Sequence, residues 1–399
     1  MRCEHAGVCG GCSLLDLGYG GQLARKVAGL RRVLSGSLPA DVLSRVMPRA
    51  SRGPSAMFLE VPDLGADPSR FRQKVAFVFA PGRSGRGIVM GHYRRGSQAV
   101  VPVVECPAHS DRGNRIAFSL FDHLARAGVS AAGPRLHGLL RHVVIRTTAD
   151  DREAVAMLVV TRNDKALRAP VGALLDSADR PDGFFVNVNT DPGPLMVGER
   201  TIRIDGRSHV REEVGGLSYL IAPTAFFQTN VRAAAVLQDT VVTSVAGAGR
   251  VLDLYCGSGL FALPLARNGV QVTGVEENRQ AVADAQANAR LNHIPASRAR
   301  FIARRVEDAV RTAGREPWDA VILDPPRQGC SDEVLQAVFQ EMAPPRVTYV
   351  SCNPDALAAE LPGIVECGYR VDALRAVDMF PHTDHVEAVV RLSSTASGR

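Results

Sequence analysis

Short stretches in which apolar and polar residues alternate recur through the N-terminal half of the chain. Such alternation predicts β-strands with one buried face, and the turn-forming residues between the stretches predict an antiparallel sheet. The predicted strands are 71–80, 87–96, 142–150, 153–162 and 184–190. Apolar residues at helical spacing predict helices near 114–128 and 165–177, and another near 22–35 that is able to pack on the C-terminal half.

From about Tyr219 onward, predicted strands alternate with helices, a pattern typical of a parallel sheet with helices on both faces. The segments that carry this pattern are 251–266, 269–278, 318–329, 346–354 and 369–392. We therefore predict an N-terminal α+β region over 1–220 and an α/β domain, doubly wound and Rossmann-like, over 221–399. Residues 47–69 are rich in Pro, Gly, Ser and Asp and are predicted to form a connector.

Reactive side chains follow the ends of several predicted strands in the C-terminal domain. Three strands that we expect to be parallel are followed by Tyr255, Asp324 and Cys352. Parallel strands end at one edge of a sheet, where ligands bind in open α/β folds. The last predicted strand runs back from that edge, which adds Glu387. A buried structural cysteine is the simpler interpretation of Cys352 alone, but its convergence with two carboxylates favours an active site.

A glycine turn follows the first of these strands. Gly257 and Gly259 allow the backbone to approach a ligand closely at the start of a helix. Glu276 ends the next strand. Its separation along the sequence from the first strand is usual for an acid that binds ribose hydroxyls. The turn also satisfies the G-x-G-x-x-A pattern of nicotinamide dehydrogenases, so the glycines alone leave the identity of the cofactor open.

A second group of cysteines lies near the start of the chain. Cys3, Cys9 and Cys12 form C-x5-C-x2-C, and the remote Cys106 is followed by Pro107, as ferredoxin-type ligands often are. Four thiolates fit either a [4Fe–4S] cluster or a tetrahedral zinc ion. Three close cysteines and one remote one are more typical of a cluster, which we therefore favour over zinc.

Charge is distributed unevenly along the 399 residues. Residues 1–220 carry 30 Lys and Arg against 21 Asp and Glu, whereas residues 221–399 carry 17 against 20. The excess of basic residues indicates a polyanionic partner for the N-terminal half. Basic stretches with aromatics at 71–74, 81–87 and 92–95 suit a phosphate backbone and a stacked base, although a charged sheet face explains them equally well.

The chain shows no apolar stretch long enough to cross a membrane, and its beginning lacks the pattern of a signal peptide. We therefore expect a cytoplasmic protein with no membrane partner. No sequence feature indicates an obligate protein partner.

Taken in order, several short motifs resemble those of the RNA uracil-C5 methyltransferases, which form 5-methyluridine in transfer RNA and large-subunit ribosomal RNA. The motifs are PTAFFQTN (223–230), DLYCGSG (253–259), LDPPRQG (323–329), SCNP (351–354) and HVE (385–387). The N-terminal cysteines resemble the iron–sulfur branch of the family, best known from ribosomal RNA enzymes. Two departures stand out. Leu260 replaces an Asn common among relatives, and Cys3 opens the chain, so the β-barrel domain of some relatives is not expected.

The resemblance implies a role for each motif residue. It implies that Cys352 is the nucleophile and Glu387 the base. Contacts to S-adenosylmethionine (SAM) are implied for Gln228, Tyr255, Glu276 and Asp324, and a [4Fe–4S] cluster is implied for Cys3, Cys9, Cys12 and Cys106. The reaction it implies is methylation of uridine C5 in RNA, with 23S ribosomal RNA favoured over transfer RNA, through a covalent Cys–C6 adduct.

Other interpretations stay open at the level of the sequence. The chain could be a SAM enzyme that acts on another nucleobase or on a small molecule. It could instead be a non-catalytic iron–sulfur protein that binds RNA. Cys256, beside the glycine turn, competes with Cys352 as a candidate nucleophile, whereas Cys330 and Cys367 are expected to be structural.

Overall fold

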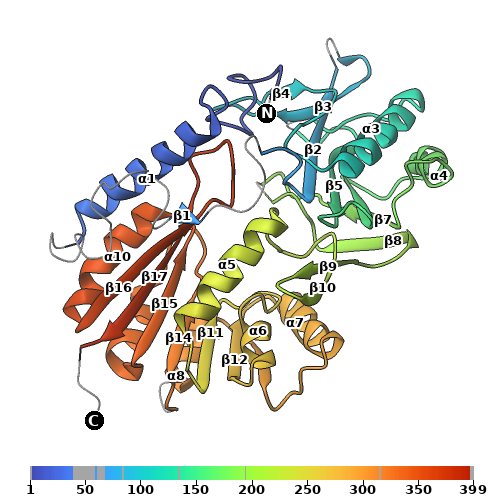
Figure 1. Ribbon diagram of the computed structural model, residues 1–399. Coiled ribbons are helices and arrows are strands. Elements are labelled where there is room, and N and C mark those ends of the chain that lie inside the picture. The colour runs from blue at the N-terminus through green and yellow to red at the C-terminus, as the bar shows by residue number, and fades with distance from the viewer. Residues whose placement is uncertain are drawn as a thin grey trace. The chain divides into compact units, whose positions relative to one another are not determined.

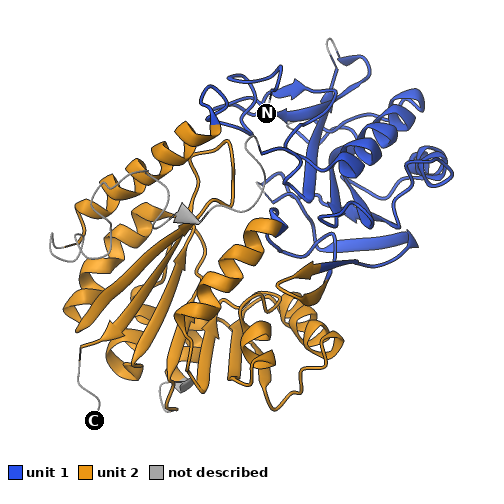
Figure 2. Ribbon diagram, in the orientation of Figure 1, with its two compact units in different colours: residues 1–18, 64–212, 220–231 blue, residues 19–63, 213–219, 232–399 orange. Residues whose placement is uncertain are grey.

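The computed structural model divides into two compact units (Figure 2). The residues described are 2–38, 59–60, 68–82, 85–133, 135–193, 195–313 and 316–395. Unit 1 comprises Met1–Gly18, Leu64–Glu212 and Leu220–Val231, and unit 2 comprises Tyr19–Asp63, Glu213–Tyr219 and Arg232–Arg399. The expected division was a single cut after residue 220, whereas each unit is built from three separate segments. Most of the expected connector lies outside the described residues.

Unit 1 is built on a seven-stranded sheet with the order β4-β3-β2-β5-β6-β7-β8. Its strands are β2 (Lys74–Pro81), β3 (Ile88–Tyr93), β4 (Val100–Pro102), β5 (Leu140–Thr147), β6 (Ala154–Val160), β7 (Gly183–Val188) and β8 (Arg200–Gly206). Neighbouring strands are antiparallel except β6 and β7. A parallel pair needs a crossover connection, and the helices between β6 and β7 provide it.

Helices cover one face of this sheet (Figure 1). They are α3 (Asp111–Arg126), the short 3-10 helix η2 (Lys165–Leu167) and α4 (Arg168–Leu175). The apolar side of α3, with Ile116, Leu120 and Leu124, packs into one core with residues of β2, β5, β6 and β7. A separate pair of strands, β9 (Val210–Val214) and β10 (Leu217–Ile221), follows β8.

Unit 2 contains an eight-stranded sheet with the order β1-β16-β17-β15-β14-β11-β12-β13. Its strands are β1 (Leu59–Glu60), β11 (Arg250–Leu254), β12 (Gln271–Glu276), β13 (Ala299–Ala303), β14 (Ala320–Leu323), β15 (Arg346–Ser351), β16 (Tyr369–Val377) and β17 (Glu387–Ser394). All neighbours are parallel except those of β17. The predicted doubly wound, Rossmann-like fold is confirmed.

Helices cover both faces of the unit 2 sheet. They are α1 (Tyr19–Ser35), α5 (Val231–Ser244), α6 (Ala262–Arg267), α7 (Arg279–Leu291), α8 (Val306–Ala313), α9 (Asp332–Gln336), the π-helical turn η3 (Ala337–Met342) and α10 (Pro354–Glu366). Figure 1 shows α5, α6 and α7 in front of the sheet. The other face carries a continuous core to which α1, α8, α9 and α10 contribute. No described helix is long and apolar enough to span a bilayer.

Helix α1 begins earlier than its sequence predicts. It starts at Tyr19 rather than near residue 22, despite two glycines in its first turn. The Tyr19 hydroxyl donates a hydrogen bond of 2.7 Å to Asp378. Lys26 forms an ion pair of 2.5 Å with the same carboxylate, and both side chains are almost fully buried. These tertiary contacts outweigh the poor helix propensity of glycine.

Candidate active site

Cys352 lies in a tight turn between β15 and α10. The turn is closed by Ser351, whose hydroxyl donates to the Asn353 carbonyl and accepts from the Asn353 amide. Asn353 is the N-cap of α10, with Pro354 in the first helical turn, where proline is tolerated. The cysteine is therefore held just before a helix N-terminus, a position that favours a thiolate.

Glu387 lies directly across from this turn. Strands β15 and β17 are antiparallel, and the last residue pair of their ladder is Ser351 with Ala388. Cys352 and Glu387 are the next residues along the two segments, one position beyond this last pair. Glu387 is 5% exposed, whereas Cys352 is half-buried. The sheet register thus places a thiol beside a carboxylate, as the convergence of strand ends predicts.

The charges at this edge act on one another. Burial and the charges of Glu387 and Asp324 raise the pKa of Cys352 to about 11, and Arg327 opposes that rise. Burial and the Asp324 charge raise the pKa of Glu387 to about 8, again opposed by Arg327. Arg327 is thus the cation that favours both the thiolate and the carboxylate. Its backbone carbonyl accepts a hydrogen bond of 2.9 Å from Asn353, which ties its loop to the cysteine turn.

Further carboxylates lie along the same edge of the sheet, at the ends of neighbouring strands. Leu254 of β11 pairs with Leu323 of β14, so Asp324 follows the strand next to the glycine turn. Burial and the Glu276 charge raise the pKa of Asp324 to about 7. Asp253, fully buried within β11, has a pKa well above its usual range because of burial and the Asp324 charge. The edge is therefore a strongly acidic site.

Glu276 holds the glycine turn in place. One of its oxygens accepts from the Gly257 amide at 3.2 Å and the other from the Asn278 amide at 2.8 Å. A carboxylate has about four acceptor sites, so capacity for ligand hydroxyls is left. Gly257 has a φ of +52°, and a Cβ added there would meet nothing within 4 Å. Open space therefore lies beside the turn.

Tyr255, at the end of β11, has a strained backbone with a φ of +66°. Its side chain packs against the unit 2 core, and burial and the neighbouring Cys330 raise its pKa above the usual range. The side chain of Leu260 is also buried. Cys256 is 5% exposed, and burial raises its pKa well above the usual value. This burial makes Cys256 a poor nucleophile compared with Cys352.

Gln228 belongs to unit 1, in the segment that precedes α5. Buried Arg146 of β5 anchors this segment by donating to the carbonyls of Ala225 at 2.5 Å and Phe227 at 3.2 Å. Gln73 also holds this segment, since its backbone amide donates to the Thr229 carbonyl at 2.7 Å. The position of Gln228 is therefore fixed within its own unit.

The N-terminal cysteines come together in unit 1. Cys3, Cys9, Cys12 and Cys106 all line one cavity of about 50 Å³. Burial raises the pKa of Cys12 to about 11, and negative charge on the other three cysteine sulfurs adds to this rise. The Gly11 amide donates to the Cys9 sulfur at 3.3 Å, a contact of the kind that stabilises a thiolate.

Backbone contacts hold these cysteines in position. The Gly10 amide donates to the Tyr93 carbonyl at 2.9 Å. Arg95 donates to the Cys12 carbonyl at 3.0 Å. Asn114 of α3 clamps the remote cysteine, because its side chain accepts from the Cys106 amide and donates to the Cys106 carbonyl. Arg95, from a basic stretch with a predicted role in RNA binding, thus supports the cysteine loop.

Comparisons with known proteins agree with this geometry. Residues 209–395 match the family model of the tRNA (uracil-5-)-methyltransferases. The chain is 31% identical to an uncharacterized RNA methyltransferase of Caldanaerobacter subterraneus over 97% of its own length and 82% of the relative's. It is 33% identical to one of Geobacter sulfurreducens, covering 98% of this chain and 76% of that protein. The chain belongs to the RNA uracil-C5 methyltransferase family.

A solved structure of this RNA methyltransferase family resembles both units of the chain. It is the tRNA (uracil-54, C5)-methyltransferase of Pyrococcus abyssi in complex with S-adenosyl-L-homocysteine. The match has a TM-score of 0.76 and 27% identity, and it covers 96% of this chain and 85% of that one.

Two residues of the acidic edge in this methyltransferase were not assigned a role from the sequence. Asp253 gave no signal, because an acid inside a strand is not distinguishable from a structural one. Arg327 follows Asp-Pro-Pro within one of the family motifs. Its effect on the pKa values of Cys352 and Glu387 was not predicted, because it depends on the conformation of the loop between β14 and α9. That loop is fixed by Glu360 of α10, which accepts from the Cys330 amide at 3.0 Å.

Proposed function

We propose that this enzyme methylates C5 of uridine in RNA through a covalent adduct between Cys352 and C6 of the uracil. The observation that carries the proposal is that the β15–β17 ladder ends at Ser351 and Ala388, directly beside Cys352 and Glu387, and that the charge of Glu387 acts on the Cys352 thiol. Uracil C5 is a weak carbon nucleophile, so a thiolate that adds to C6 is needed to activate it. A second group must then remove the C5 proton, which is a task for a base.

The steps balance as follows. The Cys352 thiolate forms a bond to C6, and the C5–C6 electron pair becomes an enolate. SAM, when bound, supplies the methyl group that C5 takes up. Glu387 removes the C5 proton, the C5–C6 double bond re-forms, and the C6–sulfur bond breaks to return the thiolate. A target uridine in a stacked or paired region must first be flipped out of the helix.

We propose Gln228, Tyr255, Glu276 and Asp324 as the residues that contact SAM. The acidic edge supports this proposal, since buried carboxylates with raised pKa values favour a ligand with positive charge. Asp324 shows this property, with a pKa of about 7. The open space beside Gly257 and the spare acceptor sites of Glu276 suit a nucleoside bound at the glycine turn.

We further propose that Cys3, Cys9, Cys12 and Cys106 hold a [4Fe–4S] cluster. They line one cavity, yet among the described residues these four do not form a set whose sulfur atoms all lie within 4.8 Å of one another. A single ion needs a closer set, whereas the irons of a cluster occupy separate corners. Anaerobic reconstitution should give about four irons and four sulfides per chain. Failure to take up iron and sulfide, with one zinc ion held by all four thiolates instead, would contradict the proposal.

Ribosomal RNA is the substrate we propose, because the four-cysteine set resembles the branch of the family known from ribosomal RNA enzymes. Transfer RNA is the second candidate, since the similar Pyrococcus abyssi enzyme acts on tRNA.

The test uses SAM and RNA substituted with 5-fluorouridine. Fluorine is not lost as a proton, so the adduct should persist on a denaturing gel. Cys352→Ala should abolish the adduct, and Cys367→Ala, which replaces another half-buried thiol, should leave it unchanged. Mapping the trapped nucleotide distinguishes ribosomal from transfer RNA. If no RNA forms an adduct while SAM binding is intact, the enzyme acts on another substrate.

A further inference from the structure

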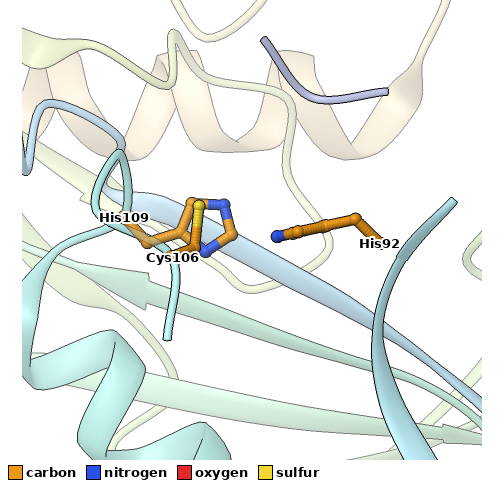
Figure 3. Close-up of side chains that lie close together, drawn as sticks. All are labelled: His92, Cys106 and His109. Carbon is orange, nitrogen blue, oxygen red and sulfur yellow. The ribbon is translucent and has the colours of Figure 1, made fainter. Parts of the chain in front are cut away.

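Two histidines, the partly buried His92 and the buried His109, line the cysteine cavity beside Cys106. One ring nitrogen of His92, one of His109 and the Cys106 sulfur all lie within 4.8 Å of one another. In Figure 3 a ring nitrogen of His92 points toward the other two side chains. Neither histidine is needed by the reaction or by the four-cysteine cluster, so their convergence calls for a separate explanation.

The histidine nitrogens are unusual because they are buried and unpaired. His109 is only 3% exposed. Its Nδ1 and the Nε2 of His92 are both buried, and neither has a hydrogen-bond partner among the residues that the structure describes. A buried polar atom without a partner destabilises the folded protein. A metal ion that accepts the nitrogen lone pairs would remove that cost.

Packing holds the two rings toward Cys106. Phe77 of β2 stacks on His92 with ring centroids 4.8 Å apart and contacts His109 edge-on at 5.0 Å. Imidazole nitrogens are the commonest protein ligands of metal ions, and both rings present one toward Cys106. The Asn114 clamp fixes the third donor.

We propose that His92, Cys106 and His109 bind one zinc ion when the cluster is absent. Nitrogen and thiolate are the donors zinc prefers, at roughly 2.0–2.1 Å and 2.3 Å, so tetrahedral donors lie roughly 3.3–3.8 Å apart. The three donors lie within 4.8 Å of one another, so side-chain movements that bring them closer would complete the site. The Cys106 thiol loses its proton on binding, and solvent completes the tetrahedron. Because Cys106 serves both metals, zinc and the cluster exclude each other.

Cobalt is the probe for this site, since tetrahedral Co²⁺ with a thiolate ligand has intense visible and charge-transfer absorption. Cluster-free full-length protein should bind one Co²⁺, which zinc displaces. His92→Asn and His109→Asn should each weaken cobalt binding by more than about 100-fold, beyond the effect of losing an outer-shell partner. His137→Asn, which changes an exposed histidine of the same unit, should have no effect.

A cysteine variant separates this proposal from the cluster. Cys12→Ser should prevent cluster reconstitution and leave cobalt binding unchanged, whereas Cys106→Ser should abolish both. The proposal is overturned if Cys12→Ser abolishes cobalt binding while the histidine variants bind normally. X-ray absorption of zinc-loaded wild-type protein decides the matter without variants. A shell with one sulfur and several nitrogens or oxygens supports the site, and four sulfurs refute it.

Discussion

Replacing Glu387 by Gln should make the protein more stable at alkaline pH. In the folded protein, burial and the Asp324 charge raise the pKa of Glu387 from 4.5 to about 8. Folding therefore favours the protonated form. Its contribution to stability is complete below pH 4.5 and is lost as the pH rises through about 8. Glutamine keeps the shape of the protonated acid and never ionises, so the variant avoids this loss.

The size of the effect follows from the pKa shift. At about 1.36 kcal/mol per unit, the rise from 4.5 to about 8 corresponds to about 5 kcal/mol. Part of this shift comes from the charge of Asp324, which itself changes its protonation state over the same pH range. The free energy of unfolding of Glu387→Gln at pH 9 should therefore exceed that of the wild type by roughly 2–5 kcal/mol. At pH 4 the stabilities of variant and wild type should be nearly equal.

Urea unfolding of both proteins between pH 4 and pH 9 measures this difference. Glu341→Gln, an exposed residue of the same unit, is the matched control and should show no pH-dependent difference. A Glu387→Gln gain that does not grow with pH would refute the buried-charge reasoning. The same variant should also accumulate a methylated Cys352–RNA adduct with ordinary RNA. In the wild type, kcat/KM should rise with pH through about 8, where the proposed base loses its proton, and should continue to rise toward about 11 as Cys352 ionises.

Three other changes test the supporting structure. Lys26→Met leaves the buried Asp378 carboxylate without its cation, and urea unfolding should show a loss of about 3–5 kcal/mol; a loss below 1 kcal/mol would contradict the buried pair. Gly257→Ala should weaken SAM binding in calorimetry, because its Cβ enters the proposed ligand space. Gly269→Ala, also at positive φ with open space around it, should cost similar stability and leave SAM binding unchanged. Arg146→Met leaves two carbonyls of the Gln228 segment unpaired, which should lower the free energy of unfolding by about 1–3 kcal/mol per group. The same change should raise the KM for SAM. An unchanged KM would argue against Gln228 as a contact.

The arrangement of the acidic edge could be predicted from the sequence because it depends on topology. Once the strands are known to be parallel, their ends must share an edge, and Asp324 and Cys352 follow from where the apolar runs stop. Glu387 follows because β17 runs back from the same edge. Neither step requires knowledge of side-chain contacts.

Features that depend on contacts between distant segments could not be predicted. Strand β13 was missed because ARFIA (299–303) is short and carries little alternation. The early start of α1 depends on Asp378, which is far away in the chain. The positive charge of Arg95 led to its assignment to a basic surface. Its contact with the Cys12 carbonyl could not be predicted, because it depends on how the N-terminal loop pairs with β3 and the residues after it.

The acidic edge also explains how a reactive thiol can stay unreactive in the resting enzyme. Burial and the nearby charges of Glu387 and Asp324 raise the pKa of Cys352 to about 11, so little thiolate exists near pH 7. A ligand with positive charge beside Asp324 would offset those negative charges and shift both Cys352 and Glu387 toward their ionised forms. Arg327 already acts in that direction and is held beside the cysteine turn by Asn353. With the roles proposed above for Cys352 and Glu387, such an arrangement would couple the chemistry to occupancy, because both groups would ionise more readily when the methyl donor is bound.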